Sequence, residues 1–224
     1  MSEILISPGF ATPFGVRHLP NCETLNTELK TLFLAREGEG RKYQEEYPTL
    51  TLKVGVFESE FGLFNWPENC VQKLKAFCFE SLGLTLMQVN GYEREDLAHM
   101  KIFNHAWFHI TRPGGYMGTH NHPMASWSGV YCVDAGDDDP DNQDSGVLRF
   151  HDPRMSVTMY MDAGNNHLTA PYEPGMRNYK FRPGQLVIFP SFLMHEVAPF
   201  TGQGTRITVA FNAWIKDRRV RGNE

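Results

Sequence analysis

The sequence is poor in cysteine, and its few cysteines do not have the spacing of a metal or redox motif. Cys22, Cys70, Cys78 and Cys132 are the only four among 224 residues, and no two of them form a CxxC pair. This excludes cysteine-based zinc ribbons and thioredoxin-like redox chemistry. It also excludes the disulfide framework of a small secreted domain, so we predict free thiols in a reducing, cytoplasmic environment.

Long apolar runs and an excess of basic charge are also missing. No segment has the roughly 20 apolar residues that a membrane-spanning helix requires, and the first residues lack the basic start and apolar stretch of a secretory signal. The formal net charge is -5, which argues against a general nucleic-acid surface. We therefore expect a soluble protein without membrane or nucleic-acid partners. A homodimer is compatible with the sequence.

Length and texture predict a single domain over residues 1–224, because no linker or internal repeat divides the chain. Residues 1–100 have a mixed helical and strand pattern that we interpret as a support region. Residues 100–215 are rich in branched and aromatic side chains and should form a β-rich core. Residues 216–224 are basic and are expected to form a solvated tail.

Helices are expected only in the first part of the chain. Apolar side chains recur at helical spacing over residues 22–36, and Gly38 and Gly40 end that pattern. A second helix should begin at Pro67 and stop at Gly83. Both should lie with one apolar face against a sheet.

Strands are expected at short intervals after Gly83, with glycine and proline pairs between them. This series is typical of a β-sandwich or barrel. The expected strands cover residues 84–89, 98–111, 126–133, 146–150, 157–161, 185–189 and 206–214.

Three histidines have the spacing of a metal site. His120 and His122 flank Asn121, and in an extended strand residues two apart point to the same face, so both can face one ion. His195 would supply a third ligand from a distant segment. Imidazole suits zinc, copper, iron or nickel, whereas an isolated histidine elsewhere in the chain is more often a surface or core residue.

An arginine shortly after His195 indicates an anchor for an acid. In a strand, Arg206, Thr208 and Asn212 share one face, and the apolar residues between them share the other. A guanidinium matches a carboxylate through two parallel hydrogen bonds, and the Thr208 hydroxyl could add a third. The alternative, a surface arginine on an edge strand, fits poorly because the strand that Arg206 begins carries the apolar residues Ile207, Val209 and Phe211.

These motifs together resemble the jelly-roll core of the Fe(II)/2-oxoglutarate-dependent dioxygenases, in particular a small group of bacterial and phage oxygenases. The resemblance covers about residues 100–215. It implies a mainly β fold, a double-stranded β-helix (jelly roll, cupin-like) with the N-terminal helices packed on the outside. The segments that carry it are His120–His122, Trp127–Tyr131, Gly146–Phe150, Pro183–Pro190, His195–Pro199 and Arg206–Thr208.

The resemblance also implies a function and a set of site residues. Fe(II) would be held by His120, His122 and His195, and 2-oxoglutarate would contact Arg206, Thr208, Tyr131 and Asn212. No catalytic residue beyond the metal centre is implied. The expected reaction is an iron-dependent oxidation that converts 2-oxoglutarate to succinate and CO₂ and hydroxylates an unidentified small molecule or peptide.

One departure from the family pattern leaves alternatives open. The family usually has HxD, whereas this chain has histidine at position 122, so either three imidazoles bind the metal or a carboxylate such as Asp134 or Asp152 completes the set. We favour three imidazoles. A cupin-type three-histidine dioxygenase without 2-oxoglutarate would leave Arg206 without a task and lacks the expected glutamate after HxH. A non-catalytic metal-binding or sugar-binding jelly roll is the third hypothesis.

Overall fold

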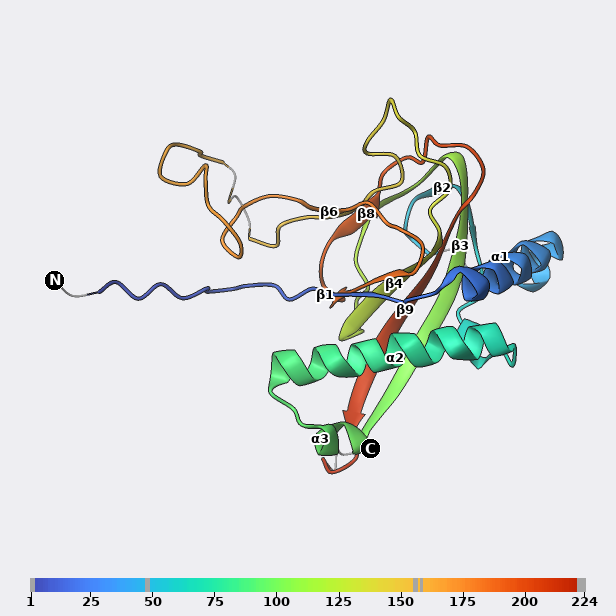
Figure 1. Ribbon diagram of the computed structural model, residues 1–224, viewed down its shortest axis with the longest axis horizontal. Helices are drawn as coiled ribbons and strands as arrows, with labels where there is room; N and C mark the ends of the chain where they lie inside the picture. The colour runs from blue at the N-terminus through green and yellow to red at the C-terminus, as the bar shows by residue number, and fades with distance from the viewer. Residues whose placement is uncertain (1–2, 47–48, 155–156, 158, 221–224) are drawn as a thin grey trace.

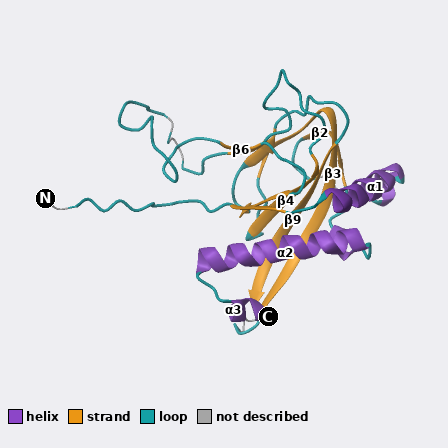
Figure 2. Ribbon diagram, in the orientation of Figure 1, coloured by secondary structure: helices purple, strands orange, loops and turns teal. Residues whose placement is uncertain are grey.

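Helices dominate the first part of the chain and strands dominate from residue 100 onward (Figures 1 and 2). The computed structural model describes residues 3–46, 49–154, 157 and 159–220. The helices are α1 (Glu23–Gly38), α2 (Asn69–Asn90) and α3 (Arg94–Ala98), with short 3₁₀ turns at Gly40–Lys42 and Leu63–Asn65. The strands are β1 (Gly15–His18), β2 (Lys53–Glu58), β3 (Met100–His120), β4 (Trp127–Asp134), β5 (Leu148–Phe150), β6 (Arg177–Tyr179), β7 (Gln185–Pro190), β8 (His195–Val197) and β9 (Arg206–Asp217).

The strands form one antiparallel sheet that curls back on itself. Its order is β1-β7-β4-β9-β3-β8-β5-β6, with β2 beside β3. The long strand β3 belongs to both halves, because Met100–Thr111 pairs with β9 while Met117 and His120 pair with β8. Between these stretches Gly114 has a φ of 85°, which glycine adopts without a steric penalty. The strand therefore bends there, and the fold is the predicted jelly roll.

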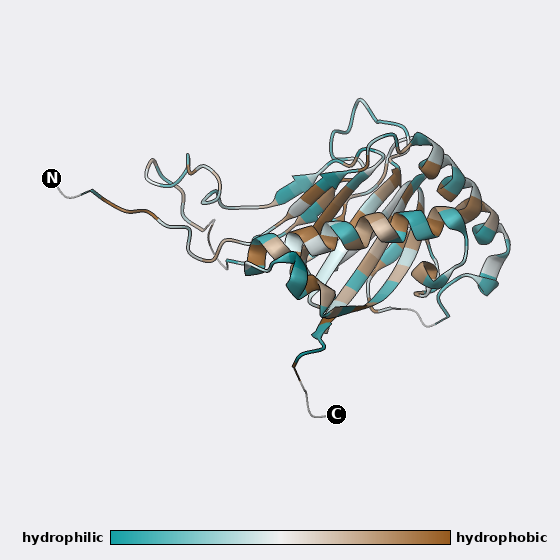
Figure 3. Ribbon diagram, turned by 60° about the horizontal axis from the view of Figure 1, so that its bottom comes forward, coloured by the Kyte–Doolittle hydropathy of each residue, from teal (hydrophilic) through white to brown (hydrophobic). Residues whose placement is uncertain are grey.

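The N-terminal helices cover the outer face of this sheet, as predicted (Figure 1). Leu29 and Phe33 of α1 and Leu74 of α2 are fully buried in one cluster with Val209 and Phe211 of β9. Polar residues alternate with these apolar positions along the helices (Figure 3). Burial of each large side chain contributes roughly 1.5–3 kcal/mol, so this layer stabilises the outer face of the sheet.

A second cluster of buried residues lies on the inner face of the curled sheet. Phe150 of β5 and Phe189 of β7 pack edge to face with ring centroids 4.6 Å apart, and Val187 and Leu193 join them. This cluster fills one part of the interior. The rest of the inner face carries polar side chains and lines a cavity.

The second helix is longer than the sequence pattern predicts. α2 continues through Gly83 to Asn90 and ends at Gly91, whose φ is 69°, so the strand expected over residues 84–89 is wrong. A helical glycine costs only about 1 kcal/mol relative to alanine. Burial of Leu82 and Leu86 on the same face outweighs that cost.

The strand expected over residues 157–161 is also wrong. Within the described part of this segment no residue is in a strand, and Met159 is 82% exposed. Its apolar alternation has no partner strand to pack against. The expected tail is partly ordered, because β9 extends to Asp217 and Arg219 forms ion pairs with Asp96 and Asp217 at 2.9 and 2.8 Å; residues 221–224 lie outside the described residues.

All four cysteines are buried free thiols, as predicted. Burial raises the pKa of the Cys132 thiol to about 12, so it stays protonated at neutral pH. Among the described residues, no helix combines the length and the apolar character needed to cross a membrane.

Replacing Gly129 with alanine should destabilise the fold. A Cβ at this position in β4 would overlap the ring of Phe211 on β9, and overpacking of a core typically costs about 1–3 kcal/mol. Gly38 at the end of α1 is the matched control, because a Cβ there meets nothing within 4 Å. Urea unfolding should show a loss for Gly129→Ala and no loss for Gly38→Ala; equal stabilities would contradict this packing.

Candidate metal and co-substrate site

A cavity of about 530 Å³ lies inside the curled sheet. The inward-facing side chains of β3 and β9 form its floor, and the ends of β3 and β8 form its upper wall. The predicted alternation of β9 is confirmed, because Arg206, Thr208 and Asn212 line the cavity while Ile207 and Val209 belong to the outer core.

His120, His122 and His195 meet at one point of this cavity. Their ligand nitrogens all lie within 4.8 Å of one another. His120 is the last residue of β3 and pairs with His195, the first residue of β8. His122 is not in a strand as the sequence suggests; it lies in the loop after β3. A hydrogen bond from its backbone N–H to Ser191 O (3.0 Å) fixes this loop.

Two of the three rings are oriented for a metal. Nδ1 of His120 donates to Gly118 O at 2.8 Å, and Nδ1 of His195 donates to Leu193 O at 2.9 Å. A backbone carbonyl on one ring nitrogen fixes the tautomer and leaves Nε2 as the ligand atom. The donor set therefore fits a divalent transition metal such as Fe(II).

The electrostatics of the cluster favour neutral imidazoles. Burial, followed by the charge of His120, lowers the pKa of His122 to about 3. Burial also lowers the pKa of His120 and lowers that of His195 well below its usual value. Since a metal binds only the unprotonated ring, the site is ready to bind one at neutral pH.

Arg206 is a buried cation without a protein partner. Arg206 is only 4% exposed. Within the described residues its side chain has no hydrogen bond and no ion pair. Its guanidinium lies 5.9 Å from the ring centroid of Phe181, and burial lowers its pKa. An unpaired buried charge is costly, so this position is built for an anionic ligand.

Two of the other residues predicted to contact 2-oxoglutarate line the cavity, and one does not. Thr208 and Asn212 face it, although Asn212 Oδ1 already accepts a hydrogen bond from Ser128 at 2.7 Å. Tyr131 points to the opposite side of the sheet, where its hydroxyl donates to Asn26 on α1 at 2.7 Å. The prediction of a Tyr131 contact is wrong, because strand parity sends this side chain into the outer core.

Neither carboxylate considered as an alternative ligand reaches the cavity. Asp134 accepts a hydrogen bond from Lys30 at 2.6 Å. Asp152 pairs with Arg154 at 2.7 Å. Both lie outside the cavity lining, so the cluster of described residues that can hold a metal consists of imidazoles alone.

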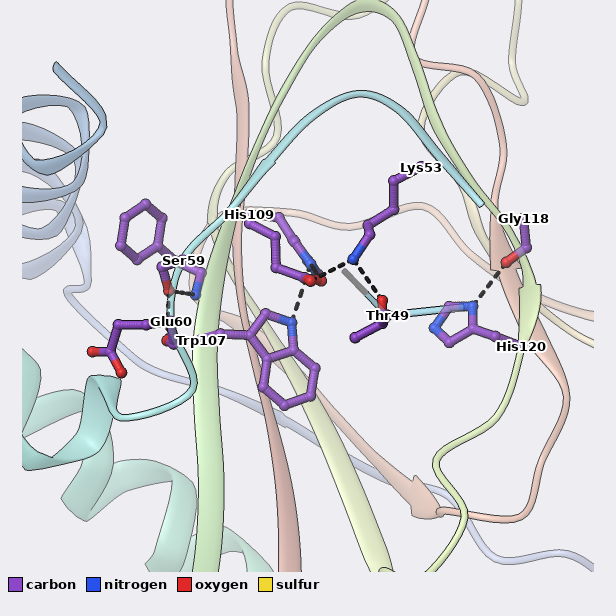
Figure 4. A network of polar contacts seen from close by, with 10 residues as sticks. Thr49, Lys53, Ser59, Glu60, Trp107, His109, Gly118 and His120 are labelled. Carbon is purple, nitrogen blue, oxygen red and sulfur yellow. Dashed lines mark hydrogen bonds and ion pairs between the residues drawn. The ribbon is translucent and has the colours of Figure 1, made fainter. Parts of the chain in front are cut away.

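The sequence interpretation missed a polar network on the opposite wall (Figure 4). Glu58 of β2 accepts from His109 Nε2 at 2.8 Å and forms an ion pair with Lys53, and Trp107 lies beside His109. Burial would raise the pKa of Glu58, but the His109 and Lys53 contacts hold it at about 2. The alternation of Trp107 and His109 in the predicted strand could have identified this wall.

Comparison with known proteins supports the interpretation of this site. Residues 105–212 match the family described as "Putative 2OG-Fe(II) oxygenase". This match contains all three histidines and Arg206. A comparison with curated protein sequences finds no match.

Solved structures of the same fold include several such oxygenases. A prolyl-4-hydroxylase from Pseudomonas putida has 16% identity and a TM-score of 0.57, covering 90% of this chain and 92% of its own. A prolyl hydroxylase from Trichoplax adhaerens has 15% identity and a TM-score of 0.57, covering 92% and 84%. HygX from Streptomyces hygroscopicus, solved with nickel and 2-oxoglutarate, has 11% identity and a TM-score of 0.54, covering 91% and 83%.

The jelly roll carries a histidine cluster at the junction of its two halves, where it could hold a metal ion. Residues 105–212 of this jelly roll match the 2-oxoglutarate-Fe(II) oxygenase family, and the solved oxygenase structures share its fold. The predicted enzyme class is thereby confirmed, and Fe(II) and 2-oxoglutarate are the cofactor and co-substrate of this class.

Acid should destabilise the metal-free protein through these histidines. A histidine whose pKa is lower in the folded state stays neutral while the unfolded chain takes up a proton, so unfolding is favoured below pH 6.5. For His122, with a pKa of about 3, the loss of unfolding free energy between pH 6.5 and 5 is about 2 kcal/mol. Urea unfolding at pH 7 and 5 should show this loss, and His122→Gln should reduce it. If the wild type and His122→Gln show the same pH dependence, the lowered pKa of His122 is contradicted.

Proposed function

We propose that the protein couples the oxidative decarboxylation of 2-oxoglutarate to the hydroxylation of a substrate at a metal held by His120, His122 and His195. The observation that carries this proposal is Arg206, a buried and unpaired cation in the same cavity as the three imidazoles. A ligand such as 2-oxoglutarate, which can chelate a metal at one end and carries a carboxylate at the other, would engage both the imidazoles and Arg206. A three-histidine dioxygenase that uses no 2-oxoglutarate would leave this cation uncompensated.

The residues around Arg206 determine where its guanidinium lies. Its side chain runs past Gly146, where an added Cβ would lie 3.0 Å from Arg206 Cδ, and ends beside Phe181. Gly146 and Phe181 therefore confine the side chain on two sides. A bidentate pair with a carboxylate depends on a fixed fork, and the Thr208 hydroxyl, two residues along the same face, can donate to the same carboxylate.

The protein side chains position the reactants, and the bound groups supply the oxidation. Fe(II), O₂ and 2-oxoglutarate would supply the oxidising chemistry, yielding succinate, CO₂ and a hydroxylated substrate. His120 and His195 are held at Nδ1 by backbone carbonyls, so both rings keep Nε2 directed at one ion.

The substrate is proposed to be a small molecule or a peptide side chain. Among the structural relatives, the Trichoplax adhaerens enzyme was solved with a peptide, and HygX was also solved with hygromycin B. The cavity of about 530 Å³ is in the size range of sites for such ligands.

The direct test is the fate of 2-oxoglutarate. Purified protein with Fe(II) and air should convert 2-oxoglutarate to succinate, slowly without a substrate and faster with one, and removal of iron by a chelator should stop the reaction. Protein that binds iron but forms no succinate under any of these conditions would instead be a non-catalytic metal-binding jelly roll.

A further inference from the structure

Aromatic rings line the cavity beside His122. Three of its lining residues form what we call the aromatic wall: Phe61, His105 and Trp107. The ring centroid of Trp107 lies 5.8 Å from that of His122 and 5.0 Å from that of Phe61. Phe61 in turn stacks on His105 with centroids 6.1 Å apart. The three rings therefore form one continuous surface that begins beside the histidine cluster.

The aromatic wall extends from the interior to the outside of the protein. Trp107 is 5% exposed, Phe61 is half-buried and His105 is exposed. Two of the rings come from β3, because residues 105 and 107 point to the same face of a strand. Phe61 lies beside them in the segment after β2, and its backbone carbonyl accepts a hydrogen bond from Ala106 N at 2.9 Å. A group that enters from solvent would therefore meet these rings on its way to the histidine cluster.

These rings do not pack in the hydrophobic core. Within the described residues, the two clusters of buried apolar side chains include neither Trp107 nor Phe61. Ala106 and Phe108, the neighbours of Trp107 along β3, belong to the outer cluster. The Trp107 N–H lies 3.1 Å from His109 Nε2, and its six-membered ring is directed away from that contact (Figure 4). An apolar ring that borders a cavity gains free energy when a ligand covers it.

Among the described residues, the cavity offers a substrate neither a free carboxylate nor a free lysine or arginine. Arg206 is the only lysine or arginine in its lining, and the proposed function assigns Arg206 to 2-oxoglutarate. Glu58 is the only carboxylate there, and its oxygens already contact Lys53 and His109 Nε2. A charged group that enters would lose hydration without gaining a partner. The cavity therefore favours an uncharged group.

We propose, resting on the function proposed above, that the part of the substrate that enters the cavity is an uncharged aromatic ring packed against Trp107 and Phe61. This ring lies beside the metal that His122 helps to hold, because Trp107 is next to His122. The C–H bond that is oxidised then belongs to the ring or to a carbon attached to it. One oxygen atom of O₂ enters that bond and the other ends in succinate, as the proposed reaction requires.

Four small probes that differ in charge or shape test this inference. Benzyl alcohol carries an uncharged ring, and benzylammonium and benzoate carry the same ring with a positive or a negative charge. The fourth probe, n-pentanol, is similarly hydrophobic but has no ring. Saturation-transfer NMR measures the affinity of each probe for the Zn(II)-loaded protein. 2-Oxoglutarate is present in excess, so that Arg206 is occupied and no turnover takes place.

Substitutions in the aromatic wall locate the bound probe. Trp107→Leu removes the ring beside His122, whereas Trp107→Phe keeps a ring there. Phe61→Leu changes a half-buried residue, so it tests the same wall if Trp107→Leu does not fold. Phe103→Leu is the matched control, because Phe103 also lies on β3 but is 43% exposed and outside the cavity lining.

Benzyl alcohol should bind the wild type and Phe103→Leu equally well, and more tightly than the two charged probes or n-pentanol. Its affinity should fall about five- to tenfold in Trp107→Leu, fall less in Trp107→Phe, and also fall in Phe61→Leu. The inference is overturned if benzyl alcohol does not bind, if a charged probe or n-pentanol binds as tightly, or if the variants of the aromatic wall bind it as the wild type does.

A second measurement places the bound ring relative to the metal. With paramagnetic Co(II) in place of Zn(II), the ring protons of benzyl alcohol should relax faster in the presence of the wild type, and unchanged relaxation would overturn the inference. Failure of the proposed function would appear differently, as a wild type that forms no succinate from 2-oxoglutarate. Saturation transfer from the metal-free protein would then still show whether the ring binds at the aromatic wall.

Discussion

Replacing Arg206 with alanine should weaken 2-oxoglutarate binding by about 2–4 kcal/mol, because a buried charge-assisted pair loses one partner. Arg206 is 4% exposed, and no other lysine or arginine of the described residues lines the cavity, so no neighbouring cation can replace it. Metal content should stay near that of the wild type. Anaerobic titration of the Fe(II)-loaded protein with 2-oxoglutarate measures the change, and exposed Arg182→Ala is the matched control.

The same residue should have the opposite effect on the ligand-free protein. Removing an uncompensated buried charge is expected to leave stability unchanged or raise it, so Arg206→Met should unfold at equal or higher urea than the wild type. 2-Oxoglutarate at a hundred times its wild-type Kd should stabilise the wild type by about 2.7 kcal/mol and Arg206→Met by less than about 1 kcal/mol. Equal affinity in the wild type and Arg206→Ala would contradict the anchor and favour the cupin-type alternative.

Removing one imidazole should abolish stable metal binding. His122→Ala deletes one of three ligands that lie within 4.8 Å of one another, and we expect iron affinity to fall by more than about 100-fold, since even loss of a partner behind a ligand costs 10–100-fold. Metal analysis after gel filtration measures the occupancy. His105→Ala is the control, because this histidine lines the cavity but lies outside the cluster.

His122→Asp distinguishes the ligand role from a packing role. It restores the two-histidine, one-carboxylate set usual in the family, so it should bind iron where His122→Ala does not. Unchanged occupancy in His122→Ala would mean that His122 is not a ligand and that another group completes the site.

The sequence predicted most of the site because strand parity is a local property. The pattern of Arg206 and Thr208 against Ile207 and Val209 holds in the structure, since one face of β9 is packed under helices. On β4 the same alternation places Tyr131 on the face that lies under α1 and α2. Strand parity predicts which residues share a face, but only the tertiary packing shows which face lines the cavity and which is covered by the helices.

The errors in the fold have a comparable cause. Gly83 signals a helix end locally, yet α2 continues because Leu86 is buried. The pairing of β2 with β3, which brings Glu58 opposite His109, joins segments 51 residues apart. The alternation of Trp107 and His109 is a local signal, but no local pattern specifies the pairing of β2 with β3, so the position of Glu58 beside His109 could not be predicted.

The central claim is that one ligand connects the histidine cluster with Arg206. Its most direct test is anaerobic addition of 2-oxoglutarate to the Fe(II)-loaded protein, followed by visible spectroscopy. We predict a weak charge-transfer band that is present in the wild type, absent in His195→Ala and displaced to much higher 2-oxoglutarate concentration in Arg206→Ala. Absence of the band from the iron-loaded wild type, together with no succinate in air, would contradict the claim.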